Sequence, residues 1–176
     1  MEEQRQIFLH GPLGQRQLRE VLSAQFCGLI LYPEIIWLIS PWMSDFDVID
    51  NRGGQWNFLD PSWGARMISF QEVLATAVNN GCPLRIVTRP DNISKVFIER
   101  MRARLSPDHD MQYKYHENLH AKGMLTANFF LKGSMNYTWS GANLNDEHLL
   151  FTINKAAISD ALIEFSGNYA FGDTND

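Results

Sequence analysis

The sequence predicts an α/β fold, and three features of the chain support this prediction. Short apolar runs at residues 34–40 and 84–88 are rich in β-branched side chains, which is typical of strands buried on both faces. Segments with the apolar spacing of helices alternate with these runs. The chain has 176 residues, of which 45% are hydrophobic and 20% charged, so it can bury one sizeable core. Strands that alternate with helices favour a sheet covered by helices.

The N-terminal half contains a predicted helix, strand, helix and strand. In residues 14–29, apolar side chains recur every three or four positions, as in an amphipathic helix. Proline residues bound the strand at 34–40 on both sides. A second helix spans residues 69–79, and the Asn-Gly pair that follows it favours a left-handed stop. The strand at 84–88 comes next.

The C-terminal half continues with a third helix, a hairpin and a final helix. Asp91 or Asn92 caps a helix that runs to about Leu105. Ala127 and Asn128 lie between two extended runs, as in a β-hairpin. The further elements are expected at residues 111–115 (strand), 121–126 and 129–132 (the hairpin strands), 149–153 (strand) and 156–165 (helix). No repeat or linker divides the chain, so we expect residues 1–176 to form a single domain.

The charge of the chain limits how it can bind a polyanion. The formal net charge is -5, which argues against nucleic-acid binding through bulk charge alone. Residues 84–132 are nevertheless net positive, so a local basic site is available there. The alternative explanation for Arg100, Arg102 and Arg104 is that they lie on the solvent-exposed face of a helix. The basic residues that could track a phosphate backbone are Arg85, Arg89, Lys95, Arg100, Arg102, Arg104, Lys114 and Lys132.

Several classes of protein are not indicated by the sequence. Cys27 and Cys82 lie far apart in apolar stretches without metal-binding spacing, so we expect no disulfide framework, no metal and no cofactor. The acidic start of the chain fits no targeting peptide. The longest apolar stretch, residues 26–40, is too interrupted to span a membrane. We therefore expect a cytoplasmic protein without membrane association.

Chemistry-bearing side chains are concentrated near the predicted hairpin. On a strand, His120 and Lys122 would point to the same face, which places an imidazole and an ammonium in one pocket. Ser134 and Asn136 repeat this spacing after the hairpin. Hydroxyl and amide donors beside a lysine suit phosphate oxygens. The carboxylate that orients the imidazole is expected to be Glu147.

Two further expectations concern residues around this cluster. Gly133 lacks a side chain, so it permits a close approach between the backbone and a ligand. The histidines outside the cluster are expected at surface or supporting positions, and they are His10, His109, His116 and His148.

These residues resemble the signature of the phospholipase D superfamily. His120-Ala121-Lys122 is similar to its H-x-K element, Gly133-Ser134-Met135-Asn136 to G-S-x-N, and Asn145-Asp146-Glu147 to N-x-E. The resemblance covers roughly residues 16–166 and includes only one copy of the motif. It implies a mixed β-sheet flanked by helices on both faces. In this superfamily, single-motif chains typically pair, so a homodimer is expected.

The resemblance also implies a mechanism that needs no metal. One His120 would attack phosphorus to form a phosphohistidine, and the partner subunit's His120 would protonate the leaving oxygen. Lys122, Ser134 and Asn136, beside Gly133, would hold the phosphate, and Glu147 would hydrogen-bond the imidazole. These roles agree with the chemistry of the side chains, because covalent catalysis and charged donors both suit phosphoryl transfer.

One position departs from the superfamily pattern. Members usually have Asp five residues after the lysine, where this chain has Ala127. That Asp is mainly structural, so its loss bears on the strand-turn geometry. Asn128 or Thr126 is expected to supply part of its hydrogen bonding.

The resemblance leaves the substrate open. Short single-motif chains resemble small bacterial endonucleases, which favours a nuclease that acts on DNA or RNA. A second interpretation is a non-hydrolytic subunit that binds nucleic acid or a protein partner. Such proteins occur in prokaryotic DNA-modification and phage-defence clusters, including the one that inserts 7-deazaguanine into DNA. A third is a phospholipid phosphodiesterase with an apolar entrance.

A Gly-rich stretch at residues 51–64 contains three large aromatic side chains, Trp56, Phe58 and Trp63. Aromatic residues in such a segment most often pack on the domain or seal an interface between subunits. Base stacking and lid formation are the functional alternatives.

Overall fold

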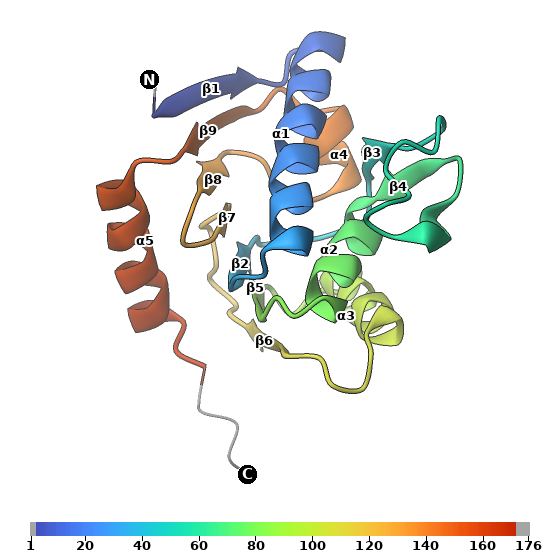
Figure 1. Cartoon of the computed structure of the whole chain (residues 1–176). Helices are drawn as coiled ribbons and strands as arrows, with labels where there is room; N and C mark the ends of the chain where they lie inside the picture. The colour runs from blue at the N-terminus through green and yellow to red at the C-terminus, as the bar shows by residue number, and fades with distance from the viewer. Residues whose placement is uncertain (1–2, 172–176) are drawn as a thin grey trace.

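The computed structural model describes residues 3–171, and a seven-stranded mixed sheet organises them (Figure 1). The strand order is β1-β9-β8-β7-β2-β5-β6, and β3 and β4 form a separate two-stranded sheet. The strands are β1 (Gln4–Phe8), β2 (Ile36–Ile39), β3 (Asp47–Asp50), β4 (Met67–Ser69), β5 (Leu84–Thr88), β6 (Met111–Tyr115), β7 (Gly123–Leu125), β8 (Phe130–Gly133) and β9 (His148–Thr152). The helices are α1 (Pro12–Leu31), α2 (Phe70–Asn79), α3 (Asn92–Arg104), α4 (Trp139–Asn143) and α5 (Lys155–Asn168), with a 3-10 turn, η1, at Pro61–Trp63.

The sheet changes direction at its central strand. β2 pairs in parallel with β5 and antiparallel with β7. All four residues of β2 are buried, as expected for a strand covered on both faces. β5 continues in parallel to β6, whereas β7, β8, β9 and β1 form an antiparallel series.

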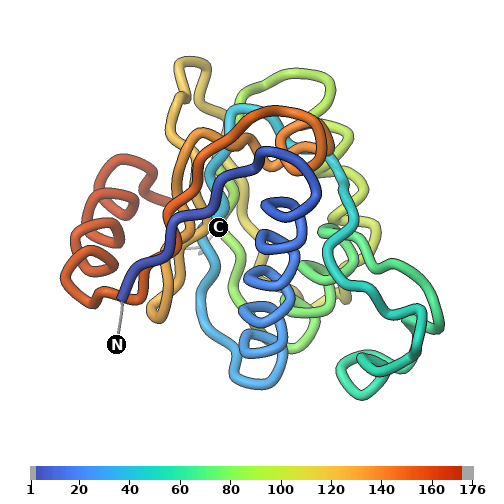
Figure 2. Tube along the Cα trace, turned by 90° about the horizontal axis from the view of Figure 1, so that it is seen from above, coloured from blue at the N-terminus to red at the C-terminus, as the bar shows by residue number. Residues whose placement is uncertain are grey.

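Helices cover both faces of the sheet, as predicted, and Figure 2 shows α1 and α5 on opposite sides of the strands. The larger core cluster joins α1, α2 and α3 to side chains such as Leu38, Ile86 and Leu131. Residues that alternate with these, including Trp37, Val87 and Phe130, belong to a second cluster with α5, in which Trp37 and Phe130 pack against Phe165.

Polar residues cap the N-termini of three helices, and the sequence placed two of them, Ser69 and Asp91, at helix starts. Ser69 precedes α2 and forms a capping box with Glu72, in which each side chain accepts a hydrogen bond from the other residue's N–H. The Asp91 carboxylate accepts from the N–H groups of Ile93 and Ser94 at the start of α3. The Asn154 side chain accepts from Ala157 N–H at the start of α5.

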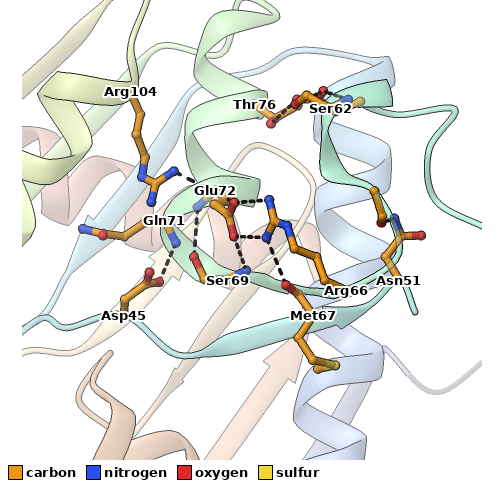
Figure 3. A network of polar contacts seen from close by, with 12 residues as sticks. Asp45, Asn51, Ser62, Arg66, Met67, Ser69, Gln71, Glu72, Thr76 and Arg104 are labelled. Carbon is orange, nitrogen blue, oxygen red and sulfur yellow. Dashed lines mark hydrogen bonds and ion pairs between the residues drawn. The ribbon is translucent and has the colours of Figure 1, made fainter. Parts of the chain in front are cut away.

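The capping box belongs to a larger polar network at the start of α2 (Figure 3). The Arg66 guanidinium donates to both Glu72 oxygens, at 2.9 and 2.6 Å, and the Glu72 side chain is only 17% exposed. Burial alone would raise the pKa of Glu72, but the hydrogen bonds from Arg66 and Ser69 N–H outweigh burial and lower it. This network fixes the start of α2 against the β3–β4 unit.

Elements with few apolar residues are absent from the sequence-based prediction. β1 is a polar edge strand that exists through its five-residue pairing with β9. β3 and β4 are short and pair mainly with each other, and α4 is a helix of five residues. The three strands depend on pairing with distant residues, which local patterns do not encode, and α4 is too short to show a helical period.

The aromatic segment between β3 and β4 projects from the body of the protein (Figure 2), and its packing differs among the three aromatic side chains. Trp63 is 2% exposed and belongs to the core, as the packing interpretation expects. Trp56 packs partly against the core, whereas Phe58 is 65% exposed. Buried Asn51 organises the segment, because its amide donates to Asn57 and to Gly64 and accepts from Trp56 N–H.

Cys82 is buried and Cys27 lies partly buried against the core, and both are free thiols. Within residues 3–171, no helix combines the length and the apolar character that crossing a membrane requires.

Replacing Glu72 tests the polar network. Glu72→Gln removes the acceptor charge that pairs with Arg66, so we expect the free energy of unfolding at pH 7 to fall by about 1–3 kcal/mol. Because folding lowers the pKa of Glu72, its contribution is complete above the ordinary carboxyl pKa and is lost as the pH falls through the folded-state value. Urea unfolding should therefore show the wild-type advantage shrinking between about pH 5 and pH 3. A difference that stays constant to pH 3 would contradict the assigned pairing.

Candidate active site

The predicted site residues gather at one edge of the sheet. β7 runs antiparallel to β2 and β8, so the start of β7 lies beside the ends of those two strands. His120 and Lys122 precede β7, and Ser134 and Asn136 follow β8. Glu147 precedes β9, which is antiparallel to β8 and starts at the same edge. The topology thus brings three separate segments of the motif together.

His120 and Lys122 lie on the approach to β7 and not on a strand, which corrects the predicted start of the hairpin. The ladder begins at Gly123, and residues 116–122 form a loop. Lys122 Nζ donates to the main-chain oxygen of His120 at 2.9 Å, so this lysine folds back over its own loop. The His120 side chain is exposed, and that of Lys122 is partly exposed.

Arg89 lies against His120. The sequence analysis named Arg89 only as one of several basic residues and did not predict this contact. One terminal nitrogen of its guanidinium is 3.4 Å from His120 Nδ1 and 3.3 Å from Nε2. Arg89 Nε donates to Leu119 O at 2.9 Å, and the guanidinium lies 4.8 Å from the ring centroid of Trp42. The available sequence signal was its position directly after the buried strand β5, whose carboxyl end lies at this edge.

Glu147 bonds to Ser134 and not to the imidazole, contrary to the expectation from the resemblance. The Ser134 hydroxyl donates to one Glu147 oxygen, and Asn145 Nδ2 donates to the other at 3.3 Å. The β8–β9 pairing explains this arrangement, because Ser134 N–H donates to His148 O and His148 N–H donates to Ser134 Oγ. The ladder holds Glu147 next to Ser134, one strand away from the loop of His120.

Gly133 is required by the fold itself. Its φ is +153°, and a Cβ there would lie 2.1 Å from His148 O. The close approach that the sequence suggested for a ligand is therefore made by the backbone of β9. Gly133 allows β8 to bring Ser134 alongside Glu147.

Asn136 has an unusual environment among the described residues. Its Oδ1 atom is buried and has no hydrogen-bond partner. Every other buried side-chain oxygen or nitrogen in residues 3–171 has one. The segment that follows is anchored to the end of β2, because Tyr137 N–H donates to Ser40 Oγ and Tyr137 O accepts from Ser44 N–H. Complete burial raises the pKa of Tyr137, which keeps its hydroxyl protonated.

Thr126 compensates for the alanine at position 127. The Thr126 hydroxyl accepts from Asn128 N–H at 3.1 Å and from Phe129 N–H at 3.2 Å. The Asn128 side chain instead donates to the Glu34 carboxylate. The hydroxyl of Thr126 thus closes the turn between β7 and β8, where the resemblance led us to expect an Asp in place of Ala127.

The basic residues of the middle segment are not all directed to this edge. Arg85 is paired with Asp110 at 2.8 Å, near the opposite end of β5, and Arg104 lies 4.0 Å from Glu72. In the described part of the chain, Arg89 and Lys122 form no salt bridge, although both donate to main-chain oxygens. Among residues 3–171, no cluster of three or more His, Cys, Asp or Glu side chains is suited to a metal ion. The site combines two cations with an imidazole, a hydroxyl and an amide, which suits a phosphate group.

Comparisons with known proteins agree with this fold. A family model described as "Cardiolipin synthase, PLD-like domain" matches residues 65–168. NucT from Helicobacter pylori is 13% identical, with a TM-score of 0.61 and 93% of each chain covered. Nuc from Salmonella typhimurium, a phospholipase D family member, is 14% identical, with a TM-score of 0.60 over 97% of this chain and 95% of that chain.

The same fold also forms part of a larger protein. Polyphosphate kinase from Porphyromonas gingivalis is 13% identical, with a TM-score of 0.63, and the match covers 98% of this chain but 27% of the kinase. No curated protein sequence matches the chain. The structural likenesses establish the fold, whereas the activity has to be argued from the site.

Replacing Thr126 tests the compensating turn. Thr126→Val leaves two backbone N–H groups without their acceptor, so we expect a loss of about 1–3 kcal/mol in the free energy of unfolding. Thr126→Ser keeps the hydroxyl and serves as the matched control, with a change within about 0.5 kcal/mol expected. Thermal unfolding of the two variants gives the comparison, and equal stabilities would show that the hydroxyl does not close the turn.

Proposed function

Because this chain belongs to the phospholipase D-like family, we propose that it is a metal-independent phosphodiesterase, and specifically a nuclease that acts in a homodimeric site. The observation that carries the proposal is the convergence of His120, Lys122, Ser134 and Asn136 at one sheet edge. The roles below combine the superfamily mechanism with the contacts of these side chains.

His120 is the proposed nucleophile. A ring nitrogen attacks phosphorus, so a P–N bond forms while the P–O bond to the leaving group breaks. The partner subunit's His120 gives its proton to the departing oxygen. Water then attacks the phosphohistidine, the P–N bond breaks, and the proton of the water returns to the partner subunit's His120. Each turnover consumes one water and leaves both histidines as they began.

The phosphate is held by the groups around His120. Lys122 and Arg89 supply positive charge, and Arg89 lies within 3.4 Å of both imidazole nitrogens, so it is close enough to bind the phosphate of the intermediate. Asn136 adds its amide N–H donors, and Ser134 lies beside the phosphate with its hydroxyl proton directed to Glu147. Glu147 acts through Ser134, because it accepts the hydrogen bond of that hydroxyl. It is therefore a positioning residue in this proposal.

The homodimer follows from the need for two imidazoles. One copy of the motif supplies one His120, so a second copy of the chain completes the set of nucleophile and general acid. An isologous pair about a two-fold axis places equivalent residues face to face, which is the simplest way to bring two His120 side chains to one phosphate.

Nucleic acid is the proposed substrate. Arg89 and Lys122 are not neutralised by carboxylates within residues 3–171, so the sheet edge is a local basic site on a chain of negative net charge. The competing interpretation, a binding subunit of a DNA-modification or defence complex, uses the same surface without the chemistry. Cleavage and binding therefore have to be measured separately.

The activity test uses labelled single- and double-stranded DNA and RNA in EDTA. The wild type is expected to cleave at least one of these substrates, and His120→Ala is expected to lose about a thousand-fold or more in rate, because the nucleophile is removed. Binding of each substrate is measured in parallel by fluorescence anisotropy. Binding by both proteins without cleavage would reject the nuclease and favour the binding subunit.

The shared site makes a quantitative prediction for mixed dimers. If each site needs two His120 side chains, a dimer with one wild-type and one His120→Ala chain is inactive. In an equimolar refolded mixture, activity per wild-type chain should fall to about half, because only pairs of two wild-type chains are active. Light scattering confirms that the dimer persists. Unchanged activity per wild-type chain would mean that each subunit works alone.

A further inference from the structure

Three aromatic rings stack beside the candidate site. Phe8, at the end of β1, lies parallel to His148, with ring centroids 4.6 Å apart and an interplanar angle of 7°. Its centroid is 6.0 Å from that of His10, at 15°. His10 Nδ1 lies 3.2 Å from an Asp146 oxygen, which ties His10 to the loop before β9. We call Phe8, His10 and His148 the aromatic stack.

The aromatic stack is joined to the phosphate-binding residues through the β-ladder. Ser134 and His148 exchange two hydrogen bonds, from Ser134 N–H to His148 O and from His148 N–H to Ser134 Oγ, each 3.0 Å long. Phe8 is the register partner of His148 on the other side of β9. Ser134 directly after β8, His148 in β9 and Phe8 in β1 therefore lie in one row.

All of these side chains project from the same face of the sheet. Ile7, Leu131 and Leu149 belong to the core cluster under α1. Because strand residues alternate, Phe8, His148, Lys132 and Ser134 point to the opposite face. On that face α5 packs over Trp37, Leu125 and Phe130, and it does not bury Phe8 or His148. Phe8 is 50% exposed, and Lys132 and His148 are also exposed.

The uncovered face therefore presents flat aromatic rings and one lysine next to Ser134. A phenylalanine half exposed in a parallel stack offers a planar surface on which another planar group can continue the stack. An unpaired nucleobase is such a group, and its backbone phosphates suit Lys132. Bases in a duplex are already stacked on both sides, so they cannot use this surface without unpairing.

We propose that the aromatic stack binds nucleobases of a single strand that flank the phosphate held at Ser134. The inference rests on the proposed function and adds a substrate class to it, namely single-stranded or locally unpaired nucleic acid. The aromatic stack is a binding surface, and the rings take no part in the chemistry.

The test compares an oligonucleotide with a small diester. Bis(p-nitrophenyl) phosphate has no flanking nucleotides, whereas a labelled 12-nucleotide single strand reaches the aromatic stack. For Phe8→Ala we expect KM for the oligonucleotide to rise about ten-fold with kcat little changed, because one base loses its stacking partner. Kinetics with the small diester should be unaltered. Phe8→Trp keeps a flat ring and should retain the wild-type KM, whereas Phe8→Leu should behave like Phe8→Ala.

Tyr32→Ala is the matched control, because Tyr32 is also an exposed aromatic residue but lies between α1 and the start of β2, at the opposite end of that strand from the site. It should leave KM for both substrates unchanged. Light scattering of Phe8→Ala distinguishes a nucleic-acid surface from a contact between subunits. Loss of the dimer would overturn the proposal, and so would an equal loss of activity on both substrates.

Binding to the aromatic stack can be tested even if the protein has no nuclease activity. Anisotropy with the same oligonucleotide and a non-cleaving His120→Ala background measures binding without catalysis. A ten-fold weaker affinity on adding Phe8→Ala supports the aromatic stack even if the wild type cleaves nothing. An unchanged affinity overturns the proposal even if the wild type proves to be an active nuclease.

Discussion

The reversal of strand direction at β2 is the constraint on which the site depends. β2 is buried on both faces, with parallel β5 on one side and antiparallel β7 on the other. In an all-parallel sheet, β7 would start at the far edge, and His120 would lie a full strand length from Arg89. The antiparallel pairing brings the loop before β7 to the end of β5. The antiparallel pairings of β8 with β7 and β9 also place the end of β8 and the start of β9 at this edge.

The parts of the fold that could be predicted are those determined by local composition. β5 and β6 begin and end where the sequence indicated, and Ser69 and Asp91 cap the helices assigned to them. Buried runs and caps are written in consecutive residues. β1 is polar and is a strand only because β9 supplies its partner, so no local signal identified it.

The sequence indicated which side chains would lie near one another at the candidate site, but it did not indicate their contacts. Spacing placed His120 and Lys122 together, yet the structure puts both on a loop, where Lys122 turns back to the His120 carbonyl. The ladder of β8 and β9 assigns Glu147 to Ser134, and Arg89 occupies the neighbourhood of the imidazole. Side-chain pairing at a sheet edge depends on strand register, and a motif read from one chain does not contain that information.

Two cations at the site edge have no carboxylate partner within residues 3–171, although the chain is acidic overall. Arg52, Arg66 and Arg85 each pair with a carboxylate, which cancels most of their field. Arg89 and Lys122 are fixed by the main-chain oxygens of Leu119 and His120, which orient them without neutralising them. A neutral acceptor positions a cation while leaving its charge for a ligand. A phosphate that reached this edge would therefore meet two cations that are already oriented and that no carboxylate in residues 3–171 neutralises.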